Sequence, residues 1–305
     1  MRVAHSPADL EQRPRTVAIG TFDGVHVGHQ AVVGAAIGAA RGPAGAGTPA
    51  AGAVSTANSV PTVVTFDPHP REVLGYEVEL LTTLERRLEL LAAVGVEEAL
   101  VVEFTPELAA LPPEDFARTY LAGIGAELVV AGESFRFGRA RSGDLALLQQ
   151  LGLQTLVVPL VPGISSTGIR QHIAAGDVRA AARLLGRPVE VEGIVVSGDA
   201  RGGTLGFPTA NLRIARSLLV PGFGIYAGAA LEHRAAVSIG INPHYGGAER
   251  RIEAFLLDYE GDLYGQRVIV ELWERLRDEA VFESEADLVA QIARDVDATR
   301  AATRP

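Results

Sequence analysis

The order of the apolar segments along the chain is the feature that most constrains its fold. Between residues 15 and 187, short runs rich in Val, Ile and Leu alternate with longer segments of helical periodicity. The strand-like runs read TVAIG, TVVTF, ALVVEF, ELVVAG and QTLVVPLV. This alternation predicts a parallel sheet flanked by helices. Right-handed crossovers would bring the loops that follow the strands to one edge of the sheet, where ligands bind in such folds.

The pattern changes beyond Val189. Runs such as VEVEGIVVSG, RAAVSIG and QRVIVELWERL are short, β-rich and separated by turn residues. Such spacing is typical of an antiparallel sheet or a small barrel. Near the end, Ser284 is followed three residues later by Asp287 and then by apolar residues at helical spacing, which predicts a terminal helix. We therefore expect an α/β domain with a parallel sheet over residues 1–186, and an antiparallel β-barrel domain over residues 187–305.

The basic residues are unusual, because all 27 are arginine and none is lysine, and the chain also lacks cysteine. A P-loop and a pyridoxal Schiff base each need a lysine, so neither chemistry is available. Disulfides, thiolate metal sites and a cysteine nucleophile are excluded as well. The net charge of -10 argues against binding to nucleic acid, since such surfaces need many cationic contacts to phosphates.

The sequence contains no run that approaches the roughly 18 apolar residues of a membrane span, and its N-terminus lacks the apolar core of a signal peptide. We therefore expect a cytoplasmic protein without membrane contact, and the sequence leaves an oligomer open. Residues 41–60 are rich in Gly, Ala and Pro without apolar periodicity, which predicts a flexible loop.

The stretch GTFDGVHVGH, residues 20–29, lies where the first strand turns into the first helix. Its two histidines, His26 and His29, stand three residues apart, so both rings can face one pocket. A helix N-terminus offers unpaired N–H groups and the positive end of the dipole, which suits a phosphate. Gly28 would let a planar group approach the backbone closely. Taken alone, the motif fits a hydrogen-bonded structural turn equally well.

Two further polar segments follow strand-like runs. FDPHP places Asp67 after the second run, and ISSTGIRQHI places Ser166, Thr167 and Arg170 after a later one. Hydroxyls and an arginine fork can bind phosphate oxygens, although the same residues also fit a helix N-cap followed by a surface arginine. Three such loops at one sheet edge predict a binding site.

A second candidate site lies in GDARGGTLGFPTANL, a glycine-rich stretch followed by a polar pair. Thr209 and Asn211 offer a hydroxyl and an amide oxygen, which are hard ligands acceptable to Mg²⁺. In the later run RRIEAFLL, strand alternation puts Glu253 on the face opposite to Ile252 and Ala254. The alternative interpretation is an ordinary turn and a solvent-facing glutamate.

These motifs carry a family resemblance. Residues 15 to about 187 resemble the adenylyltransferase half of the prokaryotic bifunctional riboflavin kinase/FAD synthetase family, within the nucleotidyltransferase superfamily. The resemblance implies a Rossmann-like domain in which His26 and His29 sit on the ATP phosphates, while Ser166, Thr167 and Arg170 close over the triphosphate. It also implicates Gly20, Phe22 and Gly28 in binding ATP, and Asp67, Ser134 and Phe135 on the flavin side. Ser134 stands where the family commonly has Asp or Asn.

The C-terminal part resembles the riboflavin kinase module, through PTAN at residues 208–211 and the segment RRIEAFLLDYEGDLYG. The resemblance implies that Glu253 accepts the proton of the ribityl 5′-hydroxyl and that Thr209 and Asn211 hold Mg²⁺. The glycine-rich stretch before PTAN is then a flap over the ATP phosphates, and it contains Arg201, Gly202 and Gly203. Two positions depart from the family, since Ser238 replaces the usual asparagine and His244 lies in NPHY instead of NPTF.

Together these features predict an enzyme that phosphorylates riboflavin to FMN and adenylylates FMN to FAD, with ATP as co-substrate and Mg²⁺ as cofactor. Its partners are then riboflavin, FMN and ATP, without nucleic acid or membrane. In one alternative, only one half is active or accepts a flavin analogue, with Ser134 or His244 responsible. In another, the chain is a non-catalytic flavin-binding regulatory protein, against which the presence of a general base argues.

Overall fold

The computed structural model of the protein describes residues 1–42, 56, 58–198, 206–241 and 250–305. Most of the expected loop at 41–60 lies outside the described residues, as do Arg201, Gly202, Gly203 and His244. Contacts divide the chain into two compact units. The first is formed by Met1–Val78 with Thr82–Ile164, and the second by Glu79–Leu81 with Ser165–Pro305. Each unit has its own sheet and its own apolar core.

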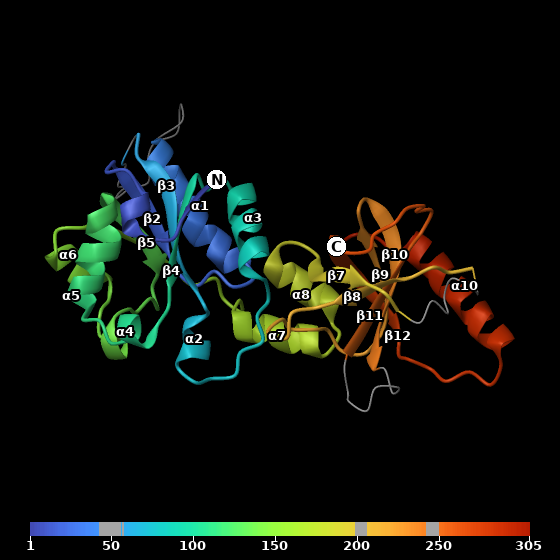
Figure 1. Ribbon diagram of the computed structural model, residues 1–305. Helices are drawn as coiled ribbons and strands as arrows, with labels where there is room; N and C mark the ends of the chain where they lie inside the picture. Colours follow the sequence, from blue (N-terminus) through green and yellow to red (C-terminus); the bar gives the residue numbers. More distant parts are fainter. Residues whose placement is uncertain (43–55, 57, 199–205, 242–249) are drawn as a thin grey trace. The chain divides into compact units, whose positions relative to one another are not determined.

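The first unit holds a six-stranded sheet in which every neighbouring pair is parallel (Figure 1). The strand order is β1-β4-β3-β2-β5-β6. The strands are β1 Arg2–Ala4, β2 Arg15–Ile19, β3 Val60–Asp67, β4 Glu98–Glu103, β5 Ala126–Gly132 and β6 Gln154–Val158. The predicted parallel sheet is confirmed. The edge strand β1 was not predicted, because three residues are too few to show a period.

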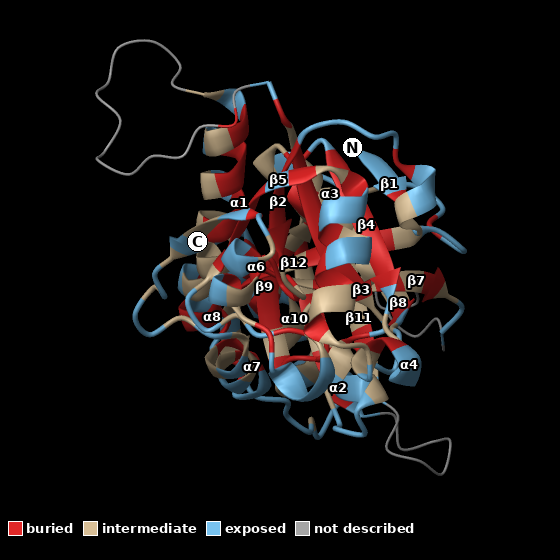
Figure 2. Ribbon diagram, turned by 90° about the vertical axis from the view of Figure 1, so that its left-hand side faces the viewer, coloured by how far each residue is buried: buried red, intermediate tan, exposed pale blue. Residues whose placement is uncertain are grey.

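Helices cover both faces of this sheet. On one face, α1 Val27–Arg41 and α3 Leu84–Val94 pack in a cluster with Ala18 and Val63. On the other, α4 Pro106–Ala109, α5 Pro113–Phe116 and α6 Leu145–Gln150 pack with Val17 and Val64. Shorter pieces are α2 Pro70–Val73, the π-helical turn Ala117–Leu121, and the 3₁₀ turns Pro7–Asp9, Ala122–Ile124 and Arg139–Arg141. Figure 2 shows β2, β3, β4 and β5 as buried along most of their length.

The strand order reverses at β2. From β2 the chain builds the sheet in one direction through β3 and β4, and then returns to place β5 and β6 on the other side of β2. In open α/β sheets, ligands bind outside the carboxyl ends of the strands at such a reversal. The loops that follow β2, β3 and β5 leave the sheet at this edge, because these three strands are parallel neighbours.

The second unit contains a closed barrel of antiparallel pairs in the order β10-β11-β8-β7-β12-β9 (Figure 1). The strands are β7 Val189–Val196, β8 Ala210–Arg213, β9 Gly224–Ala230, β10 His233–Ile241, β11 Arg250–Leu256 and β12 Arg267–Arg277. The closing helix α10 Glu285–Ala301 begins after Ser284, whose Oγ accepts a hydrogen bond from the Asp287 N–H at 3.1 Å. The predicted barrel and terminal helix are both confirmed.

Two helices that precede the barrel in sequence pack on its core. They are α7 Ser166–Ala174 and α8 Val178–Leu185. Ile169, Ile173 and Leu185 are buried in the same apolar cluster as the barrel strands. The main segment of the second unit therefore begins at Ser165, and the functional boundary expected between residues 186 and 187 stays a prediction.

Candidate functional site

The histidine loop connects β2 to α1. His26 is the N-cap of α1, and its Nδ1 accepts a hydrogen bond from the His29 N–H at 3.2 Å. This bond places the proton of the neutral His26 ring on Nε2. The two rings stack with centroids 3.6 Å apart and an interplanar angle of 16°, while Phe22 meets His29 edge-on at 5.4 Å. The structure thus brings His26, His29 and Phe22 into one aromatic cluster at a helix N-terminus.

Two glycines provide room for these rings. A Cβ at Gly28 would lie 3.2 Å from Cε1 of His26, and a Cβ at Gly20 would lie 3.2 Å from Cζ of Phe22. Both distances are shorter than ordinary carbon contacts. A side chain at either position would therefore force the neighbouring aromatic ring to shift by a few tenths of an ångström.

The backbone of this loop is strained and held in place from outside. Phe22 and the β-branched Val25 adopt φ angles of 50° and 40°, a region that such residues rarely enter. Thr82 fixes the loop, because its Oγ1 accepts the Gly24 N–H at 3.1 Å and its own N–H donates to Asp23 Oδ1 at 3.2 Å. Strain of this kind persists only where surrounding contacts enforce it, and it concentrates at functional sites.

His29 is uncharged in the free protein at neutral pH. Burial of the ring holds the pKa of His29 well below its usual 6.5, and the nearby His26 and Arg87 lower it further. Within the described part of the chain, the buried Nδ1 of His29 has no hydrogen-bond partner. An anion at this helix N-terminus would favour the protonated ring, so the pair would gain positive charge beside a bound anion.

The flavin-side candidates lie after the two neighbouring strands. Asp67 ends β3 and is partly exposed, with Oδ1 at 3.6 Å from Nη2 of Arg87. Ser134 is exposed just beyond β5. The ring of Phe135 stacks on Phe137 at 5.5 Å and borders an aromatic cluster. The candidates of the first unit therefore lie at the end of β3 or shortly after β2 or β5, at one edge of the sheet.

The remaining ATP-side candidates belong to the second unit. Ser166 and Thr167 open α7, which is capped by Ser165 through a 3.1 Å hydrogen bond from the Gly168 N–H. Arg170 donates from Nε to the Glu79 carbonyl at 2.6 Å, and both residues belong to this unit. The structure thus places these three candidates on one helix of the second unit, whereas the histidines belong to the first.

The kinase candidates converge across three barrel strands. In the strand register Glu253 of β11 lies between Asn211 of β8 and Ser238 of β10. Arg251 connects two of them, because it donates from Nε to Asn211 Oδ1 at 3.1 Å and forms an ion pair with Glu253. Thr209 lies one residue before β8 and is half-buried.

The faces of β11 follow the expected alternation. Ile252 and Ala254 are buried in the barrel core, whereas Glu253 lies on the opposite, partly exposed face. On that face the ring of Phe255 meets Phe207 edge-on at 5.5 Å. Arg251 and Phe207 were not among the predicted site residues. The signal for Arg251 was present, since it stands two residues before Glu253 and therefore shares its face.

The donor set at this site is suited to a hard cation. Asn211 offers its Oδ1 from β8, and Thr209 adds a hydroxyl one residue before this strand. Oxygen donors of this kind fit Mg²⁺, which usually keeps waters and phosphate oxygens as its other ligands. Among the described residues no group of three or more His, Cys, Asp or Glu side chains could hold a metal.

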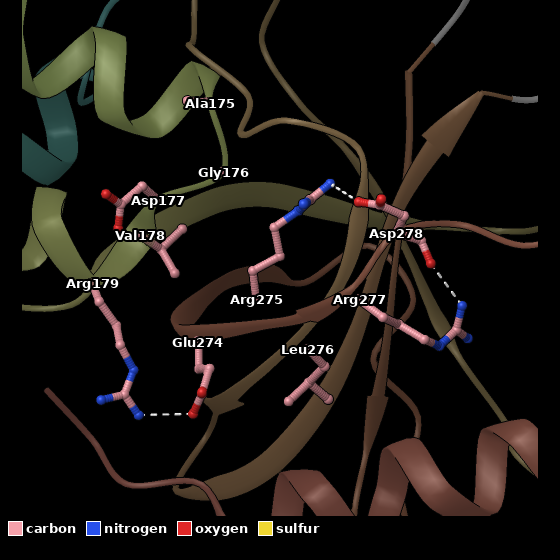
Figure 3. Close-up of a pocket in the computed structure, with 10 residues that line it drawn as sticks. All are labelled: Ala175, Gly176, Asp177, Val178, Arg179, Glu274, Arg275, Leu276, Arg277 and Asp278. Atoms are coloured by element: carbon pink, nitrogen blue, oxygen red, sulfur yellow. Dashed lines mark hydrogen bonds and ion pairs between the residues drawn. The ribbon is translucent and has the colours of Figure 1, made fainter.

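A pocket of about 530 Å³ lies elsewhere in the second unit, between the α7–α8 turn and β12 (Figure 3). Its charged side chains neutralise one another, as in the ion pairs of Arg179 with Glu274 at 2.7 Å and of Arg275 with Asp278 at 2.6 Å. The residues that line it include no site candidate from the sequence. We therefore assign no part of either reaction to this pocket.

Comparisons with known proteins agree with the two units. The FAD synthetase family model matches residues 8–170, and the riboflavin kinase family model matches residues 185–303. The bifunctional riboflavin kinase/FMN adenylyltransferase of Listeria monocytogenes is 35% identical over 304 residues, with 94% of this chain and 92% of its own covered. The Escherichia coli K12 protein of the same name is 34% identical over 311 residues, with 97% and 95% covered.

A crystal structure also matches nearly end to end. It is described as a macrolide-efflux protein from Streptococcus pneumoniae, is 32% identical, and has a TM-score of 0.83 with 98% of both chains covered. The fold, the two sites and these matches define a flavin-nucleotide transferase with two catalytic domains. The chain belongs to the bifunctional riboflavin kinase/FMN adenylyltransferase family. None of the helices in the described ranges has the length and apolarity that crossing a bilayer requires.

Proposed function

We propose that this chain phosphorylates riboflavin to FMN and then adenylylates FMN to FAD, using ATP in both steps. One observation carries the proposal. The histidine pair lies in the region matched by the FAD synthetase model, and the Glu253–Asn211 pair lies in the region matched by the riboflavin kinase model. We assign adenylylation to residues 1–186 and phosphorylation to residues 187–305. Because both steps consume ATP, we place the enzyme in the cytoplasm.

In adenylylation, an oxygen of the FMN phosphate attacks the α-phosphorus of ATP, and the bond to the departing pyrophosphate breaks. This step needs no protein nucleophile, so the protein contributes by positioning and by stabilising charge. His26 and His29 bind the ATP phosphates, and a proton taken up by the pair offsets the charge that develops there. Ser166, Thr167 and Arg170 supply further donors to the triphosphate.

The other residues of the first site shape it. Gly20 and Gly28 leave room for the aromatic cluster of Phe22 and the histidines, which supports a snug ATP subsite. On the flavin side we assign Asp67, Ser134 and Phe135. Phe135 brings an aromatic face suited to a flavin ring, and Ser134 offers a shorter polar group than the family's Asp or Asn.

In phosphorylation, the ribityl 5′-hydroxyl oxygen attacks the γ-phosphorus of ATP, and ADP leaves. Glu253 accepts the proton of this hydroxyl during the attack. The ion pair with Arg251 holds the Glu253 carboxylate in one orientation. Thr209 and Asn211 would hold Mg²⁺, which supplies positive charge to the ATP phosphates when bound. The flap residues Arg201, Gly202 and Gly203 are proposed to cover these phosphates.

The test is to incubate the purified full-length protein with riboflavin, ATP and Mg²⁺ and to separate the flavins by chromatography over time. We expect FMN to appear first and FAD to follow. A second incubation that starts from FMN isolates the adenylylation step. Failure to form FMN would refute the kinase assignment, and failure to convert supplied FMN would refute the adenylyltransferase assignment.

A further inference from the structure

Arg87 of α3 is a fully buried arginine close to the histidine loop. Its side chain is 0% exposed, although it occupies the helix stripe that also carries Leu84 and Leu91. Arginine is almost never fully buried unless it is paired. Its position among apolar residues therefore needs an explanation beyond the packing of α3.

The guanidinium of Arg87 connects the loop that follows β2 with the last residues of strand β3. Nη1 donates to the Thr21 carbonyl at 2.9 Å and to the Phe66 carbonyl at 3.0 Å. Thr21 immediately precedes the strained segment from Phe22 to Val25, and Phe66 immediately precedes Asp67. One side chain thus fixes the backbone next to both the histidine loop and the flavin-side carboxylate.

The buried guanidinium of Arg87 is poorly suited to stabilising the fold. Nε and Nη2 of Arg87 are buried and donate no hydrogen bond to any described residue, and the nearest paired carboxylate oxygen, Asp67 Oδ1, is 3.6 Å away. Burial also lowers the pKa of Arg87, against the opposing effects of Asp23 and Asp67. A buried charge with unsatisfied donors is costly, and an apolar side chain of similar volume is often as stable or more so.

We propose that Arg87 is a positioning residue for FMN adenylylation, which holds the loop after β2 and the end of β3 in the geometry that the transfer needs. The proposal rests on the adenylylation assigned to this site above. Without the Arg87 guanidinium, the strained segment from Phe22 to Val25 would lose the hydrogen bond at Thr21 and could relax, which would displace the histidines that follow it. A displacement of about 1 Å in such a site can reduce the rate about 10²-fold.

The experiment compares three full-length variants, Arg87→Met, Arg87→Lys and the control Arg86→Met. Arg86 is the neighbouring residue on the same helix, and its guanidinium pairs with Glu89 at 2.7 Å on the outer side. Each preparation is assayed for FMN adenylylation, with kcat and KM separated, and for riboflavin phosphorylation as an internal measure of intact protein. The pKa of His29 is followed by NMR of its ring proton.

We expect Arg87→Met to lower kcat for adenylylation about 10²-fold and to raise the pKa of His29, because a neighbouring cation is removed. Arg87→Lys should keep the pKa of His29 low but still lower kcat, since one ammonium cannot reproduce the planar fork. Phosphorylation should stay within about twofold in both variants, and Arg86→Met should change neither activity nor the pKa.

Adenylylation within about threefold of wild type in Arg87→Met would overturn the proposal. If that variant does not fold, Arg87→Lys decides by the same criterion. Loss of the folded first unit in both variants would also overturn it, since Arg87 would then serve the fold and not the site. A wild-type protein that forms no FAD would instead refute the proposed function, which the same assay detects separately.

Discussion

Replacing Ile169 by alanine should destabilise the barrel unit, although Ile169 lies next to a residue assigned to the adenylylation site. The side chain is 0% exposed and belongs to the apolar cluster that contains the barrel strands. The chain has a single tryptophan, Trp273, which lies on β12 of the same unit. Its fluorescence therefore reports the unfolding of this unit in the full-length protein.

The size of the effect follows from the burial of Ile169. Truncating a fully buried isoleucine to alanine removes transfer free energy and leaves a cavity, with a combined cost of about 2–5 kcal/mol. A urea m-value of roughly 2 kcal/mol/M, typical of a unit of this size, converts that loss into a midpoint shift of about 1–2.5 M. Since domains are stable by only about 5–15 kcal/mol, the change is large.

The assay is equilibrium urea unfolding of wild type, Ile169→Ala and the control Gln171→Ala, followed by Trp273 fluorescence. Gln171 lies on the exposed side of the same helix, so its substitution by alanine tests general effects on α7. We expect the midpoint to fall for Ile169→Ala and to stay nearly constant for Gln171→Ala. Equal midpoints for wild type and Ile169→Ala would show that α7 is not part of the cooperative unit of the barrel.

Three further predictions concern the two sites. His29→Ala should lower FAD formation about 10²–10³-fold while FMN still accumulates from riboflavin, measured by chromatography; undiminished FAD would make the histidine pair structural. Glu253→Gln should reduce riboflavin phosphorylation about 10²–10⁴-fold and spare ATP binding, because the amide cannot accept the proton; near-normal turnover would exclude Glu253 as the base. Because the pKa of His29 is lower in the folded state than the 6.5 of the free side chain, its contribution to stability should be complete above pH 6.5 and decline as the pH falls toward the folded pKa. Urea unfolding at pH 7.5 and 5.0 should therefore show a larger loss for wild type than for His29→Gln, and equal losses would contradict the depressed pKa.

The sheet and the barrel were predictable because they depend on local periodicity. Apolar runs alternating with helical segments can bury their faces only as helices on a parallel sheet, and the short alternating runs after Val189 only as paired antiparallel strands. The core against which an amphipathic helix packs cannot be predicted in the same way. The periodicity of α7 shows that Ile169 and Ile173 face a core, but not which core, so their packing on the barrel required the structure.

Arg87 could not be recognised as a site residue for a related reason. Its spacing from Leu84 and Leu91 places it on the buried stripe of α3, where sequence patterns expect an apolar residue. The sequence does show an arginine at a position of this helix where an apolar residue is expected. Its role depends on the carbonyls of Thr21, just after β2, and of Phe66, near the end of β3, which come within reach of Arg87 only when the sheet is assembled.

At the candidate kinase site, the strand register brings together side chains whose proximity the sequence motifs do not show. Asn211 and Glu253 are 42 residues apart in the sequence, and strand alternation alone gives each a face but no partner. The pairing of β11 with β8 and β10 sets Glu253 between Asn211 and Ser238. A slip of one residue in β11 would turn Glu253 into the core and bring Ile252 to the surface. Burying the carboxylate and exposing the apolar side chain would both destabilise the barrel, so the register is fixed. The apolar residues that close the barrel therefore also fix Glu253 between Asn211 and Ser238, so the core and the proposed kinase site of this unit are specified by the same register.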